Sequence, residues 1–177
     1  MATPAPAPGI ALERLLGAWY LLFSNRAEWR ARAHPRLELG AAEPVEGRPT
    51  LRATFRYASA DLLGRSKPRV ASMLALTDPA ALGRFEVRGS PLRRAGYPDF
   101  CVVALDPRDR WALVWHERSR LGHPPGLDLM SRDPSLTQAK LDAILAVARE
   151  HPFLATRTVG LVATTQHWFP VEPYRLP

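Results

Sequence analysis

The sequence predicts an all-β fold, an eight-stranded up-and-down antiparallel barrel with one C-terminal α-helix packed outside it. About eight short apolar segments rich in strand-forming residues follow one another at roughly ten-residue spacing. One amphipathic helix pattern comes after them. The stretch 15–25, read with period 2, is apolar on both faces, so both faces need a cover. A barrel wall with a helix outside it supplies both.

The chain divides into three parts by composition. Residues 1–11 predict a flexible Pro/Ala arm, residues 12–165 the barrel with its helix, and residues 166–177 a Pro-rich tail. A short helical turn is expected at 10–16, just before the first strand. At 177 residues, the chain is expected to form a single folded domain.

The strand predictions rest on alternating apolar and polar residues. Residues 51–57 alternate most clearly, with Leu51, Phe55 and Tyr57 on one face and Arg52 and Arg56 on the other. The other strands after the first are expected at 36–41, 70–76, 82–88, 100–105, 111–116, 127–132 and 158–162. Residues 25–34 are expected to form a loop that carries Trp29.

A helix is predicted from Thr137, as its N-cap, to about Glu150. The apolar residues recur at helical spacing and would cover one face of the barrel. They are Leu141, Ile144, Leu145 and Ala148. His151 precedes Pro152, which ends the helix.

Charge and composition narrow the classes of partner. The net charge is +7, but no basic run exceeds two residues and none is interleaved with aromatic residues, so we expect no nucleic-acid partner. No run reaches about 18 apolar residues, so no stable membrane insertion is expected. The N-terminus shows no secretory signal, and Cys101 is the single cysteine; both favour a cytoplasmic protein.

Three motifs carry a resemblance to the lipocalin family of the calycin superfamily. Residues 17–19 (Gly-Ala-Trp) match the family's Gly-x-Trp on its first strand. Residues 104–114 resemble the second signature, although Asp-Pro-Arg at 106–108 departs from its Thr-Asp-Tyr. Residues 129–134 resemble the end of the last strand, where an Arg precedes the helix. The resemblance covers about residues 12–165 and is closest to intracellular-type and bacterial lipocalins.

The resemblance implies structural roles for Gly17, Trp19 and Arg132. The Trp19 indole would close one end of the barrel, with Arg132 over its ring in a cation–π contact. The contact would join the first strand to the last, as barrel closure requires.

The resemblance and the strand parity together predict which side chains line the interior. An eight-stranded barrel holds packed side chains or one small ligand, and small residues in the lining favour a cavity. Trp111, Leu113 and Trp115 are expected to face outward, against the helix. The predicted ligand-binding residues are Leu21, Phe23, Phe55, Tyr57, Phe100, Val102, Ala104, Ala112, Val114, His116, Gly126, Asp128 and Met130.

His116 and Asp128 interrupt this apolar lining. They are expected opposite each other on neighbouring strands, where a carboxylate can orient an imidazole. Two interpretations remain open. The pair is an internal ion pair or lies exposed at the barrel mouth, or it faces the ligand as a polar anchor or acid–base pair with a raised imidazole pKa. No Ser or Cys nucleophile is placed beside it.

Arginines and one tryptophan gather after the first strand. Arg26, Arg30, Arg32 and Arg36 are interpreted either as a solvated loop or as a cationic rim that attracts anionic ligands. Trp29 is either a lid residue or an ordinary packing residue of the loop.

These features favour a protein that binds and transports a small hydrophobic molecule over an enzyme. The ligand classes implied by the resemblance are fatty acids, lysolipids, and retinoid- or porphyrin-like molecules. The alternative is an enzyme on the same barrel, using His116 and Asp128 for isomerisation, cyclisation or lyase chemistry on a hydrophobic metabolite. A third possibility is an interaction module without a ligand. No cofactor is expected, and no residue spacing gathers three metal ligands.

Overall fold

The computed structural model describes residues 3–30, 32–60, 65–89 and 97–166. The strands are β1 (Gly17–Ser24), β2 (Arg32–Val45), β3 (Arg48–Ala60), β4 (Ser66–Asp78), β5 (Ala81–Arg88), β6 (Phe100–Leu105), β7 (Trp111–His116), β8 (Gly126–Ser131) and β9 (Val162–Ala163). The helices are α1 (Leu12–Leu15), α2 (Ala27–Arg30) and α4 (Gln138–Glu150). None of the helices in these ranges is long and apolar enough to cross a membrane.

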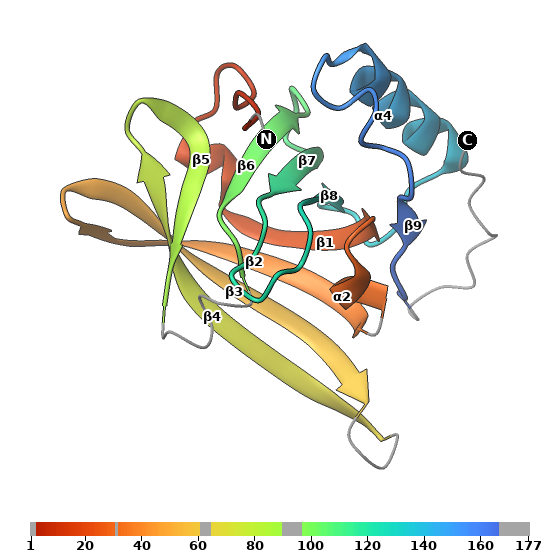
Figure 1. Cartoon of the computed structure of the whole chain (residues 1–177), viewed down its shortest axis with the longest axis horizontal. Coiled ribbons are helices and arrows are strands. Elements are labelled where there is room, and N and C mark those ends of the chain that lie inside the picture. Colours follow the sequence, from red (N-terminus) through yellow and green to blue (C-terminus); the bar gives the residue numbers. More distant parts are fainter. Residues whose placement is uncertain (1–2, 31, 61–64, 90–96, 167–177) are drawn as a thin grey trace.

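The described strands form one antiparallel sheet that closes into a barrel (Figure 1). Its order is β2-β3-β4-β5-β6-β7-β8-β1-β9, and β1 also pairs with β2. β1 therefore pairs with β2 through its first half and with β8 through its second half. This confirms the predicted eight-stranded up-and-down barrel, with β9 as a short addition beside β1.

Several elements are longer or shorter than the sequence pattern predicts. β2, β3 and β4 extend well beyond 36–41, 51–57 and 70–76, because each residue of a long hairpin gains pairing from its neighbour. The strand expected at 158–162 is wrong except at Val162, since the residues before it form turns. The loop expected at 25–34 contains α2 and the start of β2.

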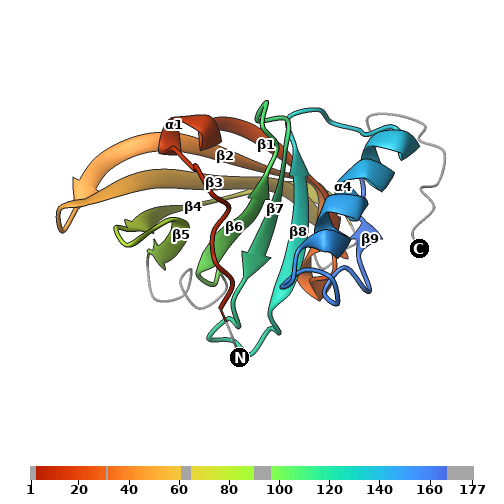
Figure 2. The same cartoon turned by 90° about the horizontal axis from the view of Figure 1, so that it is seen from above.

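α4 packs outside the barrel, as predicted (Figure 2). The Thr137 side chain caps it by accepting a hydrogen bond from the Lys140 amide, 3.3 Å away. The predicted stripe is buried against outward-facing residues of β6, β7 and β8, among them Leu113 and Leu129. This outer core covers the second apolar face of the barrel wall.

The closed end of the barrel contains the predicted contact between Trp19 and Arg132. The Arg132 guanidinium carbon lies 3.6 Å from the Trp19 ring centroid. Arg132 also donates hydrogen bonds to three carbonyl oxygens, those of Arg14 (2.9 Å), Ala18 (3.1 Å) and Asp109 (3.3 Å). Gly17 has φ +97°, a backbone conformation that favours glycine, and a Cβ there would lie 3.1 Å from Arg132 Nη1, so the guanidinium would also have to shift slightly.

The N-terminal segment is not a free arm over its described residues. β5 and β6 pair through only two residue pairs, and residues 3–10 cover the split between them (Figure 2). The Ala7 amide donates to the Val102 carbonyl (2.8 Å), and Arg84 Nη2 donates to the Pro4 carbonyl (2.8 Å). Ala7 and Ile10 are buried in the barrel core. Through these contacts the segment takes the place of missing strand pairing between β5 and β6.

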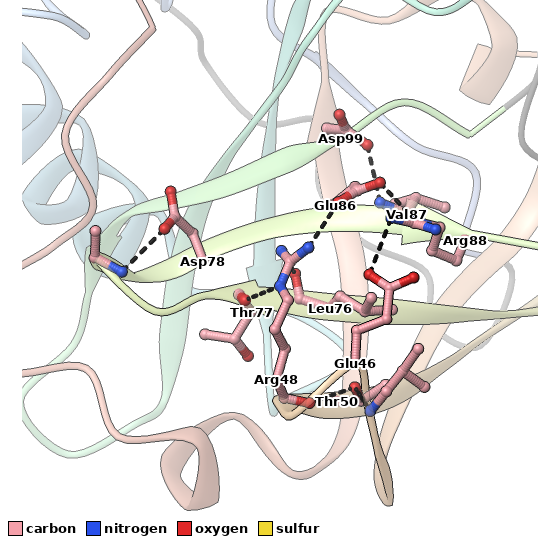
Figure 3. A network of polar contacts seen from close by, with 12 residues as sticks. Glu46, Arg48, Thr50, Leu76, Thr77, Asp78, Glu86, Val87, Arg88 and Asp99 are labelled. Carbon is pink, nitrogen blue, oxygen red and sulfur yellow. Dashed lines mark hydrogen bonds and ion pairs between the residues drawn. The ribbon is translucent and has the colours of Figure 1, made fainter.

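A polar network joins the β4–β5 hairpin to the start of β3 on the outside of the barrel (Figure 3). Arg48 donates to Glu86 (2.8 Å) and to the Thr77 carbonyl (2.8 Å), while Arg88 donates to the other oxygen of Glu86 (2.6 Å). Hydrogen bonds from Arg88 and Arg48 lower the pKa of Glu86. The network ties three strands together along the barrel's outer surface.

Candidate functional site

The barrel interior is an apolar core built from every strand of the wall. Apolar side chains from β1 to β8 lie together there and are almost fully buried. The members from the predicted lining are Leu21, Phe55, Phe100, Val102, Ala112, Val114 and Met130, with Tyr57 packed partly against them. The structure therefore brings most of the predicted lining residues together.

Two predicted lining residues, Phe23 and Ala104, lie in the outer core under α4 instead. A β-bulge in β1 between Leu21 and Phe23 reverses the facing of the residues that follow. A second bulge, between Val102 and Ala104 in β6, has the same effect. Each bulge turns one apolar side chain from the interior to the helix side.

The sequence reasoning missed interior residues from the long hairpin strands. Leu37 and Leu39 of β2 and Met73 of β4 are buried in the same interior core. The alternation Arg-Leu-Glu-Leu at 36–39 was a usable signal for the first two. Met73 lies in a segment that is apolar on both faces, where alternation gives no facing.

α2 places Trp29 over the interior at the end of the barrel opposite Trp19. The Trp29 ring is buried and lies 5.6 Å from Phe55 and 6.1 Å from Tyr57, centroid to centroid. Phe55 in turn stacks on Tyr97 at 5.1 Å. We call Trp29, Phe55, Tyr57 and Tyr97 the mouth cluster. Trp29 Nε1 is buried without a hydrogen-bond partner among the described residues.

Arg32 covers the mouth cluster. Its guanidinium carbon lies 4.6 Å from the Trp29 ring and 4.4 Å from the Tyr57 ring, a double cation–π contact. In the described part of the chain no carboxylate pairs with it. Burial, followed by a hydrogen bond with Tyr57, raises the pKa of Tyr97 to about 12. The mouth thus presents the guanidinium of Arg32 beside the phenols of Tyr57 and Tyr97.

A buried polar network lies beside the mouth cluster. His116 Nε2 is 3.0 Å from Asp128 Oδ2, and Arg26 Nη1 is 3.3 Å from the same oxygen. Ser24 Oγ donates to Asp128 Oδ1 at 2.6 Å, and Arg26 also pairs with Glu28. All of Ser24, Arg26, His116 and Asp128 are at most 5% exposed. The network fixes α2 to the barrel wall through Arg26 and Glu28.

Two expectations about His116 and Asp128 are corrected. They are diagonal rather than opposite, because His116 pairs with Gly126 and Asp128 pairs with Val114. The pKa of His116 is lowered, not raised: burial is the main cause, the charge of Arg26 adds to it, and Asp128 only partly offsets them. Contacts with His116 and Arg26 lower the pKa of Asp128 despite its burial.

These pKa directions describe a neutral imidazole held by an ionised carboxylate. Since Asp128 carries no proton, His116 Nε2 must donate the hydrogen bond between them. His116 Nδ1 is then the proton acceptor of the ring. Asp128 thus has a hydrogen-bond donor in His116, and His116 Nδ1 can still act as a base.

The arginines after β1 do not form one rim. Arg26 is buried in the network, Arg32 covers the mouth cluster, and Arg36 lies near Tyr20 on the outside of the barrel. The side chain of Arg30 lies outside the described residues, as does the tail at 167–177. Of the three whose side chains are described, Arg32 is therefore the one placed to meet an anionic group at the mouth.

Cys101 faces the outer core and packs as a small apolar residue. Burial raises the pKa of its thiol to about 11. Within the described ranges, no three His, Cys, Asp or Glu side chains are grouped to hold a metal ion.

The fold matches solved structures, although the sequence alone finds no match. No protein-family model matches the chain, and no curated protein matches it significantly. Insecticyanin from the tobacco hornworm Manduca sexta superposes with a TM-score of 0.65 at 11% identity, over 92% of this chain and 84% of that one. The cockroach allergen Per a 4 gives 0.60 at 14% identity, over 93% and 94%.

Lobster apocrustacyanin A1 is similar as well, with a TM-score of 0.54 at 13% identity over 92% of this chain and 90% of its own. All three similarities extend over nearly the whole barrel and its helix. Together with the closed sheet and the Trp19–Arg132 contact, they show that the chain has the lipocalin fold.

Proposed function

We propose that the barrel binds one small hydrophobic molecule, such as a fatty acid or lysolipid, in its interior and carries it. The observation that supports this most is the continuous apolar interior core, which runs from Trp19 at the closed end to Trp29 at the mouth. Eight-stranded barrels are of the size that holds one small ligand. Burial of apolar surface supplies the affinity, about 25 cal/mol per Å² before entropic costs.

Arg32 is the group proposed to hold the polar end of the ligand. Its charge faces aromatic rings and no described carboxylate, whereas the charge of Arg26 is shared by Asp128 and Glu28. A ligand carboxylate or phosphate would accept hydrogen bonds from Arg32 and from the phenols of Tyr57 and Tyr97. The unpartnered Trp29 Nε1 is a further donor.

Trp29 has to move aside for the ligand to enter. Its ring lies against Phe55 and Tyr57 and is part of the interior core. Trp29 belongs to α2, a helix of only four residues, and the ion pair between Arg26 and Asp128 anchors the residue just before this helix to the wall. Trp29 is thus the proposed lid.

The proposal is tested by titrating the protein with 11-(dansylamino)undecanoic acid and following dansyl fluorescence. Saturable binding of one equivalent at micromolar concentration is expected. Arg32→Gln should weaken binding about tenfold through the lost charge-assisted hydrogen bonds. Trp29→Ala should speed association. Arg52→Gln, on the exposed outer face of β3, is the control and should change neither. Absence of saturable uptake would remove the carrier proposal.

A second function, acid–base catalysis on a hydrophobic metabolite, is supported by one observation. His116 is a neutral base oriented by the ionised carboxylate of Asp128, at 3.0 Å. Incubating the protein with hydrophobic ketones in D₂O and following C–H exchange by NMR would detect such a base. Exchange that disappears in His116→Ala and Asp128→Asn, while dansyl-probe binding persists, would favour the enzyme. No exchange with the wild type would exclude proton abstraction from these ketones.

A further inference from the structure

A hollow lies on the outer face of β1 to β4, outside the interior core. Its volume is about 630 Å³, within the range of small-molecule sites. One row of the sheet forms its base, since Tyr20 pairs with Arg36, Arg36 with Arg56, and Arg56 with Val70. We call it the outer hollow.

The side chains of this row point away from the barrel interior. Leu37, Phe55 and Ala71, the neighbours of Arg36, Arg56 and Val70 along their strands, are buried in the interior core. Side chains alternate along a strand, so the row faces out. This row of the outer hollow therefore lies on the other side of the barrel wall from the interior core, and the two regions share Tyr57, which lines the hollow and also belongs to the mouth cluster.

The outer hollow is cationic. Arg36, Arg56 and Arg69 line it, and no described carboxylate does. Arg56 pairs with Glu38 at the exposed surface, 3.2 Å away. Arg36 has no carboxylate partner in the described chain, and its Nε is buried without a hydrogen bond. Like charges directly opposite on neighbouring strands are unfavourable, which an anion between Arg36 and Arg56 would relieve.

The same hollow offers apolar surface beside the charges. Val70 is 57% exposed. The Tyr20 ring and Pro134 line the hollow next to it. A ligand that fits both features has an anionic group and a compact apolar or aromatic body.

We propose that the outer hollow binds an amphipathic organic anion. Its carboxylate, sulfonate or phosphate lies against Arg36 and Arg56, and its apolar body lies on Tyr20 and Val70. The groups proposed to hold this anion, Arg36, Arg56, Tyr20 and Val70, are different from those proposed to hold the polar end of a ligand inside the barrel, so either site can exist without the other.

The test compares two fluorescent probes that differ only by a sulfonate. 8-Anilinonaphthalene-1-sulfonate carries the anionic group, and N-phenyl-1-naphthylamine lacks it. Arg36→Gln and Val70→Glu are expected to weaken binding of the sulfonate probe at least about tenfold, because one removes a charge and the other adds a repelling one. Arg52→Gln, on the same face of β3 but outside the hollow, should leave the affinity within about twofold.

The uncharged probe separates this proposal from the one for the barrel. Its binding should be the same in all these variants, and near-ultraviolet circular dichroism should show that each variant is folded. In methyl NMR spectra the sulfonate probe should shift the Val70 signals. Equal affinity of the sulfonate probe in wild type, Arg36→Gln and Val70→Glu would overturn the proposal. So would binding to phosphatidylglycerol vesicles without binding of the monomeric probe, which would indicate a lipid surface instead.

Discussion

At the scale of single residues, Gly126 leaves the space that the buried Arg26 side chain occupies. A Cβ at this position would lie 2.3 Å from Arg26 Cγ and 2.8 Å from Asn25 Oδ1. Arg26 holds α2, and with it Trp29, against the barrel. Even the methyl group of alanine at position 126 would therefore displace Arg26 and, through it, the proposed lid residue Trp29.

Gly126→Ala should lower the free energy of unfolding by about 1–3 kcal/mol, the usual cost of overpacking. Gly40→Ala in β2 is the matched control, since an added Cβ there meets nothing within 4 Å. Its effect should stay within about 0.5 kcal/mol. Urea unfolding measures both. An equal change in the free energy of unfolding for the two substitutions would show that Arg26 moves aside without destabilising the protein.

His116 makes stability depend on pH. Its pKa in the folded state lies below the value of about 6.5 expected in the unfolded chain. The unfolded state therefore takes up the proton first as the pH falls. The stabilisation is present above about pH 6.5 and is lost as the pH drops below it.

His116→Gln keeps a donor for Asp128 but does not titrate, so it should flatten the fall in unfolding free energy between pH 7 and 5. His123→Gln, which removes a histidine from the loop before β8 instead, is the matched control. Urea midpoints across this pH range provide the measurement. A parallel fall in wild type and His116→Gln would assign the pH dependence to other groups.

The sequence predicted which residues contribute to the barrel wall better than it predicted which side of the wall each side chain faces. The resemblance and the strand parity together placed Leu21, Val102 and Val114 inside correctly, because their strands are regular up to those positions. The prediction failed at Phe23 and Ala104, since a bulge inserts one residue and no local pattern announces it. The lowered pKa of His116 depends on burial and on Arg26, neither of which strand parity describes.

At the scale of elements, the sequence predicted features that depend on one segment alone. It did not predict features that depend on pairing between segments. The helix was predicted to begin after Thr137 and end at Glu150, and it does, because cap and stripe are local. The lengths of β2, β3 and β4 depend on pairing with each other. The docking of residues 3–10 depends on a split between β5 and β6 that their sequences do not show.

Deletion of residues 2–9 should open that split and expose Cys101. In the folded chain Cys101 is 2% exposed, and its Sγ lies 3.8 Å from the Pro4 carbonyl oxygen. Its pKa of about 11 keeps the thiol protonated at pH 8. The rate of reaction with a chromogenic disulfide at pH 8 should rise at least about tenfold on deletion. An unchanged rate would mean that the segment does not cover the thiol; Cys101→Ser in the deleted chain serves as the blank.

At the scale of the whole molecule, closure of the barrel depends on Arg132. It joins the end of β8 to α1, β1 and the β6–β7 turn through three carbonyl oxygens and the Trp19 ring. Arg132→Met keeps the length of the side chain but leaves those carbonyls without their donors. The expected loss is about 2–4 kcal/mol of unfolding free energy.

Arg110→Met is the matched control for this prediction, because Arg110 lies at the same end of the barrel but pairs with Asp133 at the surface. Its loss should be below about 1 kcal/mol. Thermal or urea unfolding compares the two. Similar losses would show that Trp19 and Arg132 contribute no more than a surface ion pair.

Methyl NMR during titration with dodecanol tests the central claim, that the interior of the barrel holds one small hydrophobic molecule, most directly. Dodecanol is uncharged and is therefore not expected to bind in the outer hollow. The account predicts that the methyl signals of Val102 and Val114, inside the barrel, shift and saturate at one equivalent, while Val70 outside does not. If Val102 and Val114 keep their positions at every concentration, the interior is a packed core and binds no such ligand.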